Sequence, residues 1–209
     1  MVSISVEKKY KKNKNYKEDV YKMEKTKILI VYGTRYGATA STAEEISNIL
    51  QDEGFDVRVV NLKEEKVRDI SDFELIIVGS GIKMEMWTNK AKAFLKKFSD
   101  ELKKKKVAIF VSSGGRALIE HKGEYDEIDR ITKKYLEDKA SKYGLNPISM
   151  SMFGGVWDYN QMSKIYRKFL DAEKENFVAA GIKETKPGVY DTRNWDNIRK
   201  WTKELANKV

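Results

Sequence analysis

The chain has 209 residues, with 41 Lys and Arg against 32 Asp and Glu, one His and no Cys. The lack of cysteine excludes disulfides, Cys-ligated zinc or iron–sulfur centres and a cysteine nucleophile, and one histidine excludes multi-histidine metal sites. The formal net charge of +9 favours acidic partners, such as phosphate groups, anionic lipid or carboxylate-bearing substrates, without choosing among them. With 41% hydrophobic residues, the chain is sufficient for one domain with a core of its own.

The first 22 residues differ in character from the rest. They have no sustained apolar period and no run long enough for a signal sequence or a membrane span. Lysines are frequent among them, and charge runs of this kind are usually solvated. We predict a basic, disordered N-terminal tail over residues 1–22 and one domain over residues 23–209. Met23 directly precedes the first predicted strand, so both Met1 and Met23 are candidates for the natural start.

From Lys27 onward, short apolar runs alternate with amphipathic helical patterns. Residues of strand character cover 27–32, 55–62, 74–79, 107–111 and 147–153. Helical periodicity covers 43–50, 88–102, 125–143, 161–180 and 195–207. Because strands and helices alternate, and crossovers between parallel strands are right-handed, the pattern predicts an α/β fold with a doubly wound parallel sheet.

The loop after the first strand is the first candidate for a binding site. In an open α/β sheet, ligands bind beyond the carboxyl ends of the strands, and here residues 33–39 lead directly into a helix. Hydroxyl groups at Thr34 and Thr39, together with backbone N–H groups at a helix N-terminus, would make an anion cradle. The predicted ligand is a phosphate. The alternative is a plain β–α turn with a glycine and an N-capping threonine.

Other phosphate motifs do not fit this loop. No Gly-Lys-[Ser/Thr] follows it, so it is not a nucleotide triphosphate P-loop, and the Gly-x-Gly-x-x-Gly dinucleotide pattern is missing. A phosphoacceptor receiver domain would need clustered carboxylates at the end of the first strand, and that position has none. These classes are therefore disfavoured.

Residues 34–39, Thr-Arg-Tyr-Gly-Ala-Thr, resemble the flavodoxin phosphate signature Thr/Ser-x-Thr/Ser-Gly-x-Thr and follow the first strand as it does. Tyr36 replaces the small hydroxyl residue that is usual at its position. The resemblance extends over nearly all of residues 27–209. It implies a flavodoxin-like five-stranded sheet of order 2-1-3-4-5, with helices on both faces and FMN as the cofactor.

A narrower resemblance is to the flavodoxin-like, menaquinone-linked protoporphyrinogen IX dehydrogenases. Their first loop, Ser-Thr-Arg-x-Gly-x-Thr, is similar to residues 33–39 apart from its first residue. Their Ala-Ser-Ile-Arg-Tyr segment is similar to residues 80–87, where Lys83 replaces the arginine. A Thr-Asp-Trp-Glu stretch of that family resembles residues 194–196. The charged helical region predicted over 116–143 departs from the family, because it does not resemble a membrane-inserting device.

The resemblance also implies where FMN binds. We expect its phosphate on residues 34–39 and its ring between loops 80–87 and 112–115. Trp87 is a candidate for stacking on the ring and Lys83 for contact with its N1–O2 edge, against the alternatives of a core tryptophan and a solvated lysine. No acid–base catalytic residue and no metal ligand is named. The expected cofactor-binding residues are Thr34, Arg35, Tyr36, Gly37, Ala38, Thr39, Ser80, Gly81, Ile82, Lys83, Met84, Trp87, Ser112, Ser113, Gly114 and Gly115.

Three classes of function remain open. The first is an FMN oxidoreductase that exchanges electrons between a small substrate and a quinone or protein, including the protoporphyrinogen dehydrogenase type. The second is an electron carrier between redox proteins, and the third is an interaction module without FMN. Because the carriers that the chain resembles tend to be acidic, its basic charge favours a small anionic substrate or a membrane surface where a quinone resides. We expect a cytoplasmic protein, with peripheral membrane contact left open, and no nucleic-acid partner.

Overall fold

The computed structural model describes residues 25–171 and 174–209. The tail predicted over residues 1–22, and Met23, lie outside these residues. In chain order, the described elements are β1 (Lys27–Gly33), α1 (Ala38–Asp52), β2 (Asp56–Asn61), β3 (Leu75–Gly81), α2 (Asn89–Lys97), α3 (Ser99–Leu102), β4 (Lys106–Ser112), α4 (Arg116–His121), α5 (Tyr125–Thr132), the π-helical turn η1 (Lys133–Glu137), α6 (Asp138–Lys142), β5 (Ser149–Phe153), β6 (Val156–Asp158), the 3₁₀ turn η2 (Tyr159–Gln161), α7 (Lys164–Asp171), α8 (Lys174–Ala179), β7 (Glu184–Lys186), β8 (Val189–Asp191) and α9 (Trp195–Ala206).

The main sheet has five parallel strands in the order β2-β1-β3-β4-β5, as predicted. Strands β1, β3 and β4 lie inside the sheet and are buried over almost their whole length, because helices cover both of their faces. The register pairs Gly33 with Ser80 and Gly81 with Ser112, so the carboxyl ends of these three strands lie next to one another. The loops that leave them therefore meet at one edge of the sheet.

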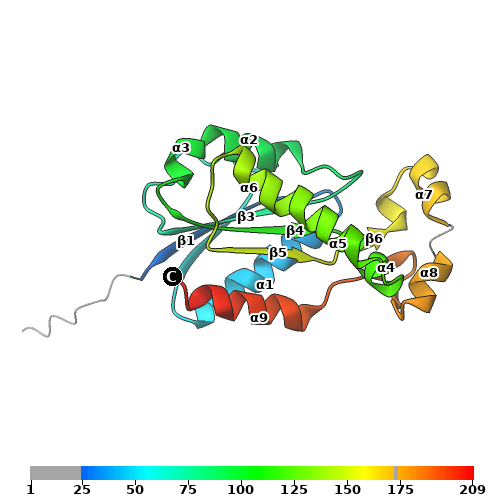
Figure 1. Cartoon of the computed structure of the whole chain (residues 1–209). Coiled ribbons are helices and arrows are strands. Elements are labelled where there is room, and N and C mark those ends of the chain that lie inside the picture. The colour runs from blue at the N-terminus through cyan, green and yellow to red at the C-terminus, as the bar shows by residue number, and fades with distance from the viewer. Residues whose placement is uncertain (1–24, 172–173) are drawn as a thin grey trace, which may run out of the picture.

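Helices pack on both faces of this sheet, as Figure 1 shows. Helices α1 and α9 lie on one face, where α1 places Ile46 and Leu50, and α9 places Ile198 and Leu205, in one buried cluster. Helices α2 and α3 and the α5–α6 region cover the opposite face. Both clusters consist of side chains at helical spacing packed on β-branched strand residues, which is the arrangement that the alternating pattern predicts.

The helical region predicted over residues 116–143 is divided into several pieces. Helix α4 ends at His121, and Gly123 turns the chain with φ +71°, a left-handed conformation that glycine adopts without a Cβ clash. Helix α5 then continues through η1 into α6. The π-helical turn contains Tyr135 and Leu136, which are both buried. Such turns insert one extra residue and are frequent at functional sites.

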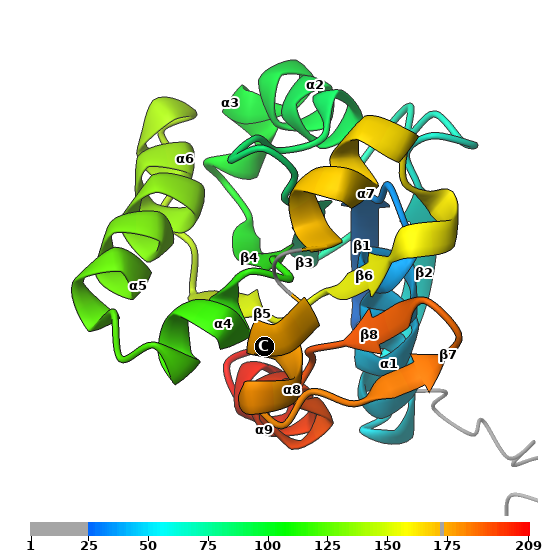
Figure 2. The same ribbon diagram turned by 90° about the vertical axis from the view of Figure 1, so that its right-hand side faces the viewer.

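A second, smaller sheet was not predicted. Strands β6, β8 and β7 form an antiparallel sheet in that order, and with η2, α7 and α8 they lie beyond the carboxyl ends of the main sheet (Figures 1 and 2). We call the described residues 156–171 and 174–191 the accessory unit. Its own buried cluster includes Tyr159, Met162 and Phe177, and it reaches Leu118 of α4. The strands escape sequence reasoning because each has three residues and β7 is exposed throughout.

Arg193 fastens the end of the accessory unit to the first turn of α1. Its guanidinium donates to the carboxylate of Asp191 at 2.6 Å and to the carbonyl oxygen of Ala38 at 3.0 Å, and it also reaches the hydroxyl of Ser41. The same group lies 4.2 Å from the ring centroid of Trp195. The side chain of Arg193 is only 7% exposed, so this ion pair is largely desolvated. It joins the accessory unit to the part of α1 that borders the loop 33–39.

Among the residues that the structure describes, no helix has both the length and the apolar character that crossing a membrane requires.

Candidate functional site

The loop after β1 forms a cradle at the N-terminus of α1. Gly37 precedes the helix with φ +88°, and its N–H donates to the hydroxyl oxygen of Thr34 at 3.1 Å. No side chain caps the helix, so the alternative of a plain turn with an N-capping threonine is not what forms. The N–H groups of the first helical turn have no acceptor within the helix, and the helix dipole adds partial positive charge there. This combination suits an anion.

A cavity of about 40 Å³ lies against this cradle. It is lined by Thr34, Thr39, Gly81 and Ser112, among others. The hydroxyl of Ser112 is buried and has no hydrogen-bond partner among the described residues, which is costly unless a bound group supplies one. A Cβ atom at Gly81 would lie 3.1 Å from the hydroxyl oxygen of Thr39 and would crowd it. The donors and the restricted space fit a phosphate group.

Arg35 joins the cradle to the loop after β3. Its guanidinium donates to the carbonyl oxygens of Met86 at 3.1 Å, Trp87 at 3.4 Å and Gly81 at 3.4 Å. Arg35 also lines the small cavity. Its charge therefore holds two loops together at the border of the site, which the sequence alone did not indicate.

The loop after β3 contains a tight turn with an unusual backbone. Lys83 and Met86 exchange backbone hydrogen bonds of 3.1 and 3.0 Å, while Met84 and Glu85 between them have φ of +48° and +58°. Residues other than glycine rarely adopt this conformation. Hydrogen bonds to Lys134 and Arg130 lower the pKa of Glu85 and tie the turn to the α5–η1 region.

Lys83 and Tyr36 are in contact and line both the small cavity and a larger one beside it. The ammonium of Lys83 donates to the hydroxyl of Tyr36 and lies 4.9 Å from the centroid of its ring. Both side chains are partly buried. Lys83 is therefore not the fully solvated loop lysine of the alternative interpretation. The hydroxyl of Tyr36 accepts a hydrogen bond from this cation at the border of the cradle.

The larger cavity has a volume of about 200 Å³. Its walls come from the loops after β3 and β4, the α4–η1 region and the accessory unit, which Figure 2 shows over the carboxyl ends of the main sheet. The two cavities are adjacent, because both are lined by Tyr36, Ile82, Lys83, Gly114 and Val156. We call the larger one the ring cavity, since it has the place that the sequence assigned to a planar ring.

Two polar groups that line the ring cavity were missed in the sequence. Tyr135 is 4% exposed, and burial raises its pKa to about 12. It is a neutral donor at any physiological pH. The indole nitrogen of Trp157, from β6, is also buried without a partner in the described part of the chain. No local signal identifies either residue, because each belongs to a segment far in sequence from the glycine-rich loops.

Two residues predicted to contact the cofactor have structural positions instead. Trp87 is 1% exposed, packs in the core and donates from its indole nitrogen to the carbonyl oxygen of Tyr135 at 2.9 Å. It directly precedes Thr88, whose side chain caps α2, and an apolar residue before a cap commonly packs against its helix. The expectation of ring stacking by Trp87 is therefore wrong. Ser80 is fully buried and accepts from the N–H of Thr88 at 3.0 Å, and it lines neither cavity.

The structure brings most of the other predicted residues together. Gly37 lines neither cavity but shapes the cradle through its backbone. The predicted residues that line one or both cavities are Thr34, Arg35, Tyr36, Ala38, Thr39, Gly81, Ile82, Lys83, Met84, Ser112, Ser113, Gly114 and Gly115.

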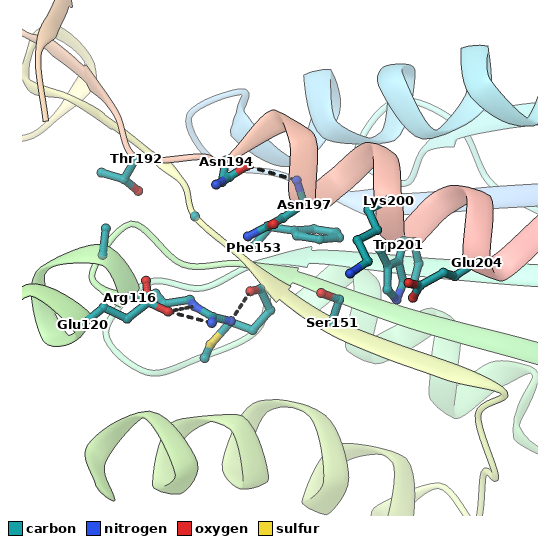
Figure 3. A pocket seen from close by; sticks show the side chains of 13 residues that line it. Arg116, Glu120, Ser151, Phe153, Thr192, Asn194, Asn197, Lys200, Trp201 and Glu204 are labelled. Atoms are coloured by element: carbon teal, nitrogen blue, oxygen red, sulfur yellow. Dashed lines mark hydrogen bonds and ion pairs between the residues drawn. The ribbon is translucent and has the colours of Figure 1, made fainter. Parts of the chain in front are cut away.

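A third cavity, of about 280 Å³, lies at the outer edge of β5 between α4 and α9 (Figure 3). Arg116 is paired there with Glu120 and donates to the carbonyl oxygen of Met152 at 2.6 Å. Lys200 and Glu204 of α9 add one charge of each sign. This cavity shares no lining residue with the other two and contains none of the glycine-rich loops. It therefore lies apart from the candidate cofactor site.

Comparisons with known proteins bear on this geometry. A family model described as a flavodoxin domain matches residues 29–175, more than two thirds of the chain. Among solved structures, oxidised flavodoxin 1 from Bacillus cereus is 15% identical over 73% of this chain and 97% of its own, with a TM-score of 0.46. The Streptococcus pneumoniae TIGR4 flavodoxin is 17% identical over 88% and 100%, with a TM-score of 0.49. Two-electron reduced Megasphaera elsdenii flavodoxin is 21% identical over 74% and 98%, with a TM-score of 0.46. No curated protein matches the chain.

Proposed function

Because the chain belongs to the flavodoxin family, whose cofactor is FMN, we propose that the two adjacent cavities bind FMN and that the protein transfers electrons through it. The observation that carries the proposal is the adjacency of the two cavities. A cavity of about 40 Å³ at the uncapped N-terminus of α1 shares five lining residues with one of about 200 Å³. One end suits a phosphate group and the other a planar ring.

The phosphate end is assigned to groups at the start of α1 and at the end of β4. The N–H groups of the first turn of α1 and the hydroxyls of Thr39 and Ser112 donate to the phosphate oxygens, and each of these bonds is charge-assisted. Thr34 acts mainly on the loop, since its hydroxyl already accepts from the N–H of Gly37. Partnering the hydroxyl of Ser112 removes the cost of a buried, unpaired polar group.

The ring end is assigned to residues that hold the flavin and exclude water. The bound flavin supplies the redox chemistry, and the protein orients it and sets its electrostatic surroundings. Lys83 places a positive charge at the border of the ring cavity, which favours a reduced, negatively charged flavin. Tyr135 offers a neutral hydroxyl donor, and Gly114 and Gly115 leave room for a flat ring.

The finer function that we favour is an oxidoreductase acting on a small molecule. The accessory unit supports this choice, because it adds Val156, Trp157 and Met162 to the walls of the ring cavity and so helps to form a pocket of the kind that a small molecule needs. The protoporphyrinogen IX dehydrogenase type, with a quinone as acceptor, is the most specific candidate. Its support is the similarity of residues 33–39 and 80–87 to that family.

Binding of FMN is tested by titration of the purified protein, followed by the flavin absorption spectrum. We expect the wild type to take up FMN and the Thr34→Ala, Thr39→Ala double variant to bind it at least about tenfold more weakly, because hydrogen bonds to charged groups contribute roughly 1.5–3 kcal/mol each. Thr185→Ala, on the exposed strand β7, is the control and should bind FMN like the wild type. A wild type that takes up no flavin would contradict the proposal and favour the interaction module.

The substrate class is tested by turnover of the FMN-loaded protein. Oxidation of protoporphyrinogen IX with menaquinone as acceptor is the expected result for the dehydrogenase type. Turnover of another small molecule with a quinone would retain the oxidoreductase and reject protoporphyrinogen. Reduction or oxidation of the flavin by redox proteins alone would favour the electron carrier.

A further inference from the structure

Trp157 carries a hydrogen-bond donor that no described residue uses. Its indole nitrogen is buried and has no partner among residues 25–171 and 174–209. An indole N–H donates and cannot accept, so only an acceptor atom can satisfy it. A buried donor left unpaired destabilises the folded protein. The side chain lines the ring cavity, which is therefore the place to look for the acceptor.

The accessory unit holds this indole in one orientation. Trp157 pairs with Tyr190 across the β6–β8 ladder, and its ring meets Phe177 edge-on with a centroid distance of 5.4 Å. Phe177 is fully buried and stacks in turn on Tyr190 at 5.0 Å. Because these aromatic contacts surround the indole, rotating the N–H toward another partner would disrupt the core of the accessory unit.

The indole nitrogen approaches the backbone of the loop after β4. A Cβ atom built on Gly114 would lie only 2.4 Å from it, so any side chain at this position would displace the indole. Gly114 lines both the small cavity and the ring cavity. The donor thus lies beside Gly114, in a loop that the sequence predicts to border the ring.

Trp201 shows that an unpaired indole nitrogen does not by itself indicate this site. Its nitrogen also has no partner among the described residues, but Trp201 belongs to the separate cavity at the edge of β5, as Figure 3 shows. Its ring packs on Phe110 and Phe153, with centroids 6.5 and 5.5 Å away. It is therefore a matched control for Trp157: the same chemical group, equally unpaired, in a cavity without the cofactor loops.

On the basis of the proposed function, we propose that the indole N–H of Trp157 donates a hydrogen bond to an acceptor atom of the FMN ring. The isoalloxazine ring carries two carbonyl oxygens and N1, which accept hydrogen bonds in the oxidised and in the anionic reduced flavin, and a donor-only indole requires such an acceptor. Reduction increases the electron density on these acceptors, so the hydrogen bond is stronger in the reduced state. Trp157 then raises the flavin midpoint potential as well as the affinity for FMN.

The direct test is the indole N–H signal of Trp157 in a ¹H–¹⁵N NMR spectrum of the wild-type protein titrated with FMN. The chain has four tryptophans, and the signal is assigned by its absence in Trp157→Phe. We expect it to move downfield when FMN binds, because a hydrogen bond deshields the donated proton. The signals of Trp87, which already donates to Tyr135, and of Trp201 should stay in place.

Two variants give independent readouts. Trp157→Phe should bind FMN about tenfold more weakly and shift the midpoint potential of the bound flavin to more negative values, whereas Trp201→Phe should change neither quantity. The apo form of Trp157→Phe should unfold in urea close to the wild type, because the removed N–H was unpaired. If that variant does not fold, Trp157→Leu, which also removes the N–H and leaves the loop after β4 unchanged, replaces it and should show the same two changes.

The outcomes separate this proposal from the one on which it rests. If the wild type binds FMN but the Trp157 N–H signal does not move and the potential of Trp157→Phe equals that of the wild type, only the assignment of Trp157 is overturned. If the wild type binds no FMN, the proposed function fails and the assignment fails with it.

Discussion

The phosphate cradle and the ring cavity are built in different ways. The cradle lies mostly within residues 33–39, one β–α turn whose conformation is fixed by Gly37 and by the start of α1. The ring cavity takes its walls from four regions that are distant in sequence, and the accessory unit supplies one of them. The first is therefore a local backbone device, and the second depends on tertiary packing. Substitutions in the cradle should weaken the binding of the flavin's phosphate, whereas substitutions in the ring cavity should weaken the binding of its ring.

We expect the largest effect on stability from removing Arg193, which attaches the accessory unit to α1. Arg193→Ala leaves Asp191 partly buried without its cation and removes the bonds to the first turn of α1, so we expect a loss of about 3 kcal/mol in the free energy of unfolding, measured in urea. Arg199→Ala, which removes a more exposed ion pair between α9 and Glu45 of α1, is the control and should change little. Equal losses in the two variants would show that Arg193 is not a special attachment point.

The cradle is tested through its left-handed glycine. Gly37→Ala has open space for the new methyl group, so its cost is the backbone strain of a positive φ, about 1–2 kcal/mol. Gly54→Ala, at the other end of α1, carries the same strain with open space around it. Both variants should be destabilised alike, but only Gly37→Ala should weaken FMN binding. Equal FMN affinities would mean that the loop conformation does not matter to the site.

The ring cavity is tested by removing one hydroxyl. Tyr135→Phe keeps the buried ring and should weaken FMN binding about fivefold, because a neutral hydrogen bond contributes roughly 1 kcal/mol. Tyr143→Phe, whose hydroxyl donates to the carbonyl oxygen of Lys92 outside the cavity, should leave binding unchanged. Since burial raises the pKa of Tyr135 to about 12, its contribution should stay constant between about pH 6 and pH 10.

The smallest expected effect concerns the ion pairs that Glu85, in the loop after β3, makes with Lys134 and Arg130. Lys134 and Arg130 lower the pKa of Glu85 in the folded protein, so the stabilisation by this carboxylate is complete above its ordinary pKa of 4.5 and is lost as the pH falls through the lowered value. The urea midpoint of the wild type should therefore exceed that of Glu85→Gln slightly at about pH 6 and meet it at strongly acidic pH. A difference that persisted in acid would rule out the ionised form as the cause.

The same contrast explains which parts of the molecule the sequence predicts. The sheet order and the cradle follow from contiguous patterns, namely buried β-branched runs and one turn between β1 and α1. Trp87 was assigned to the ring because it lies in the correct loop. Its position next to the cap Thr88 instead directs it into the core. Composition and spacing alone do not distinguish these two environments.

The accessory unit could not be predicted from the sequence. Its strands are three residues long, so their alternation is too short to stand out from a loop. The approach of Trp157 to Gly114 depends on tertiary structure, since the two residues are separated by a helical region and β5. Tyr135 belongs to a helical stripe of apolar residues, and only the tertiary structure shows that it lines the ring cavity.

The account predicts one FMN site with a local phosphate end and a tertiary ring end, and the most direct test compares FMN with riboflavin, which lacks the phosphate. Dissociation constants for both ligands should be measured with the wild type, the Thr34→Ala, Thr39→Ala variant and Tyr135→Phe. We expect the double threonine variant to weaken FMN toward the affinity of riboflavin while leaving riboflavin unchanged, and Tyr135→Phe to weaken both ligands by the same factor. A wild type that binds FMN no more tightly than riboflavin would contradict the account.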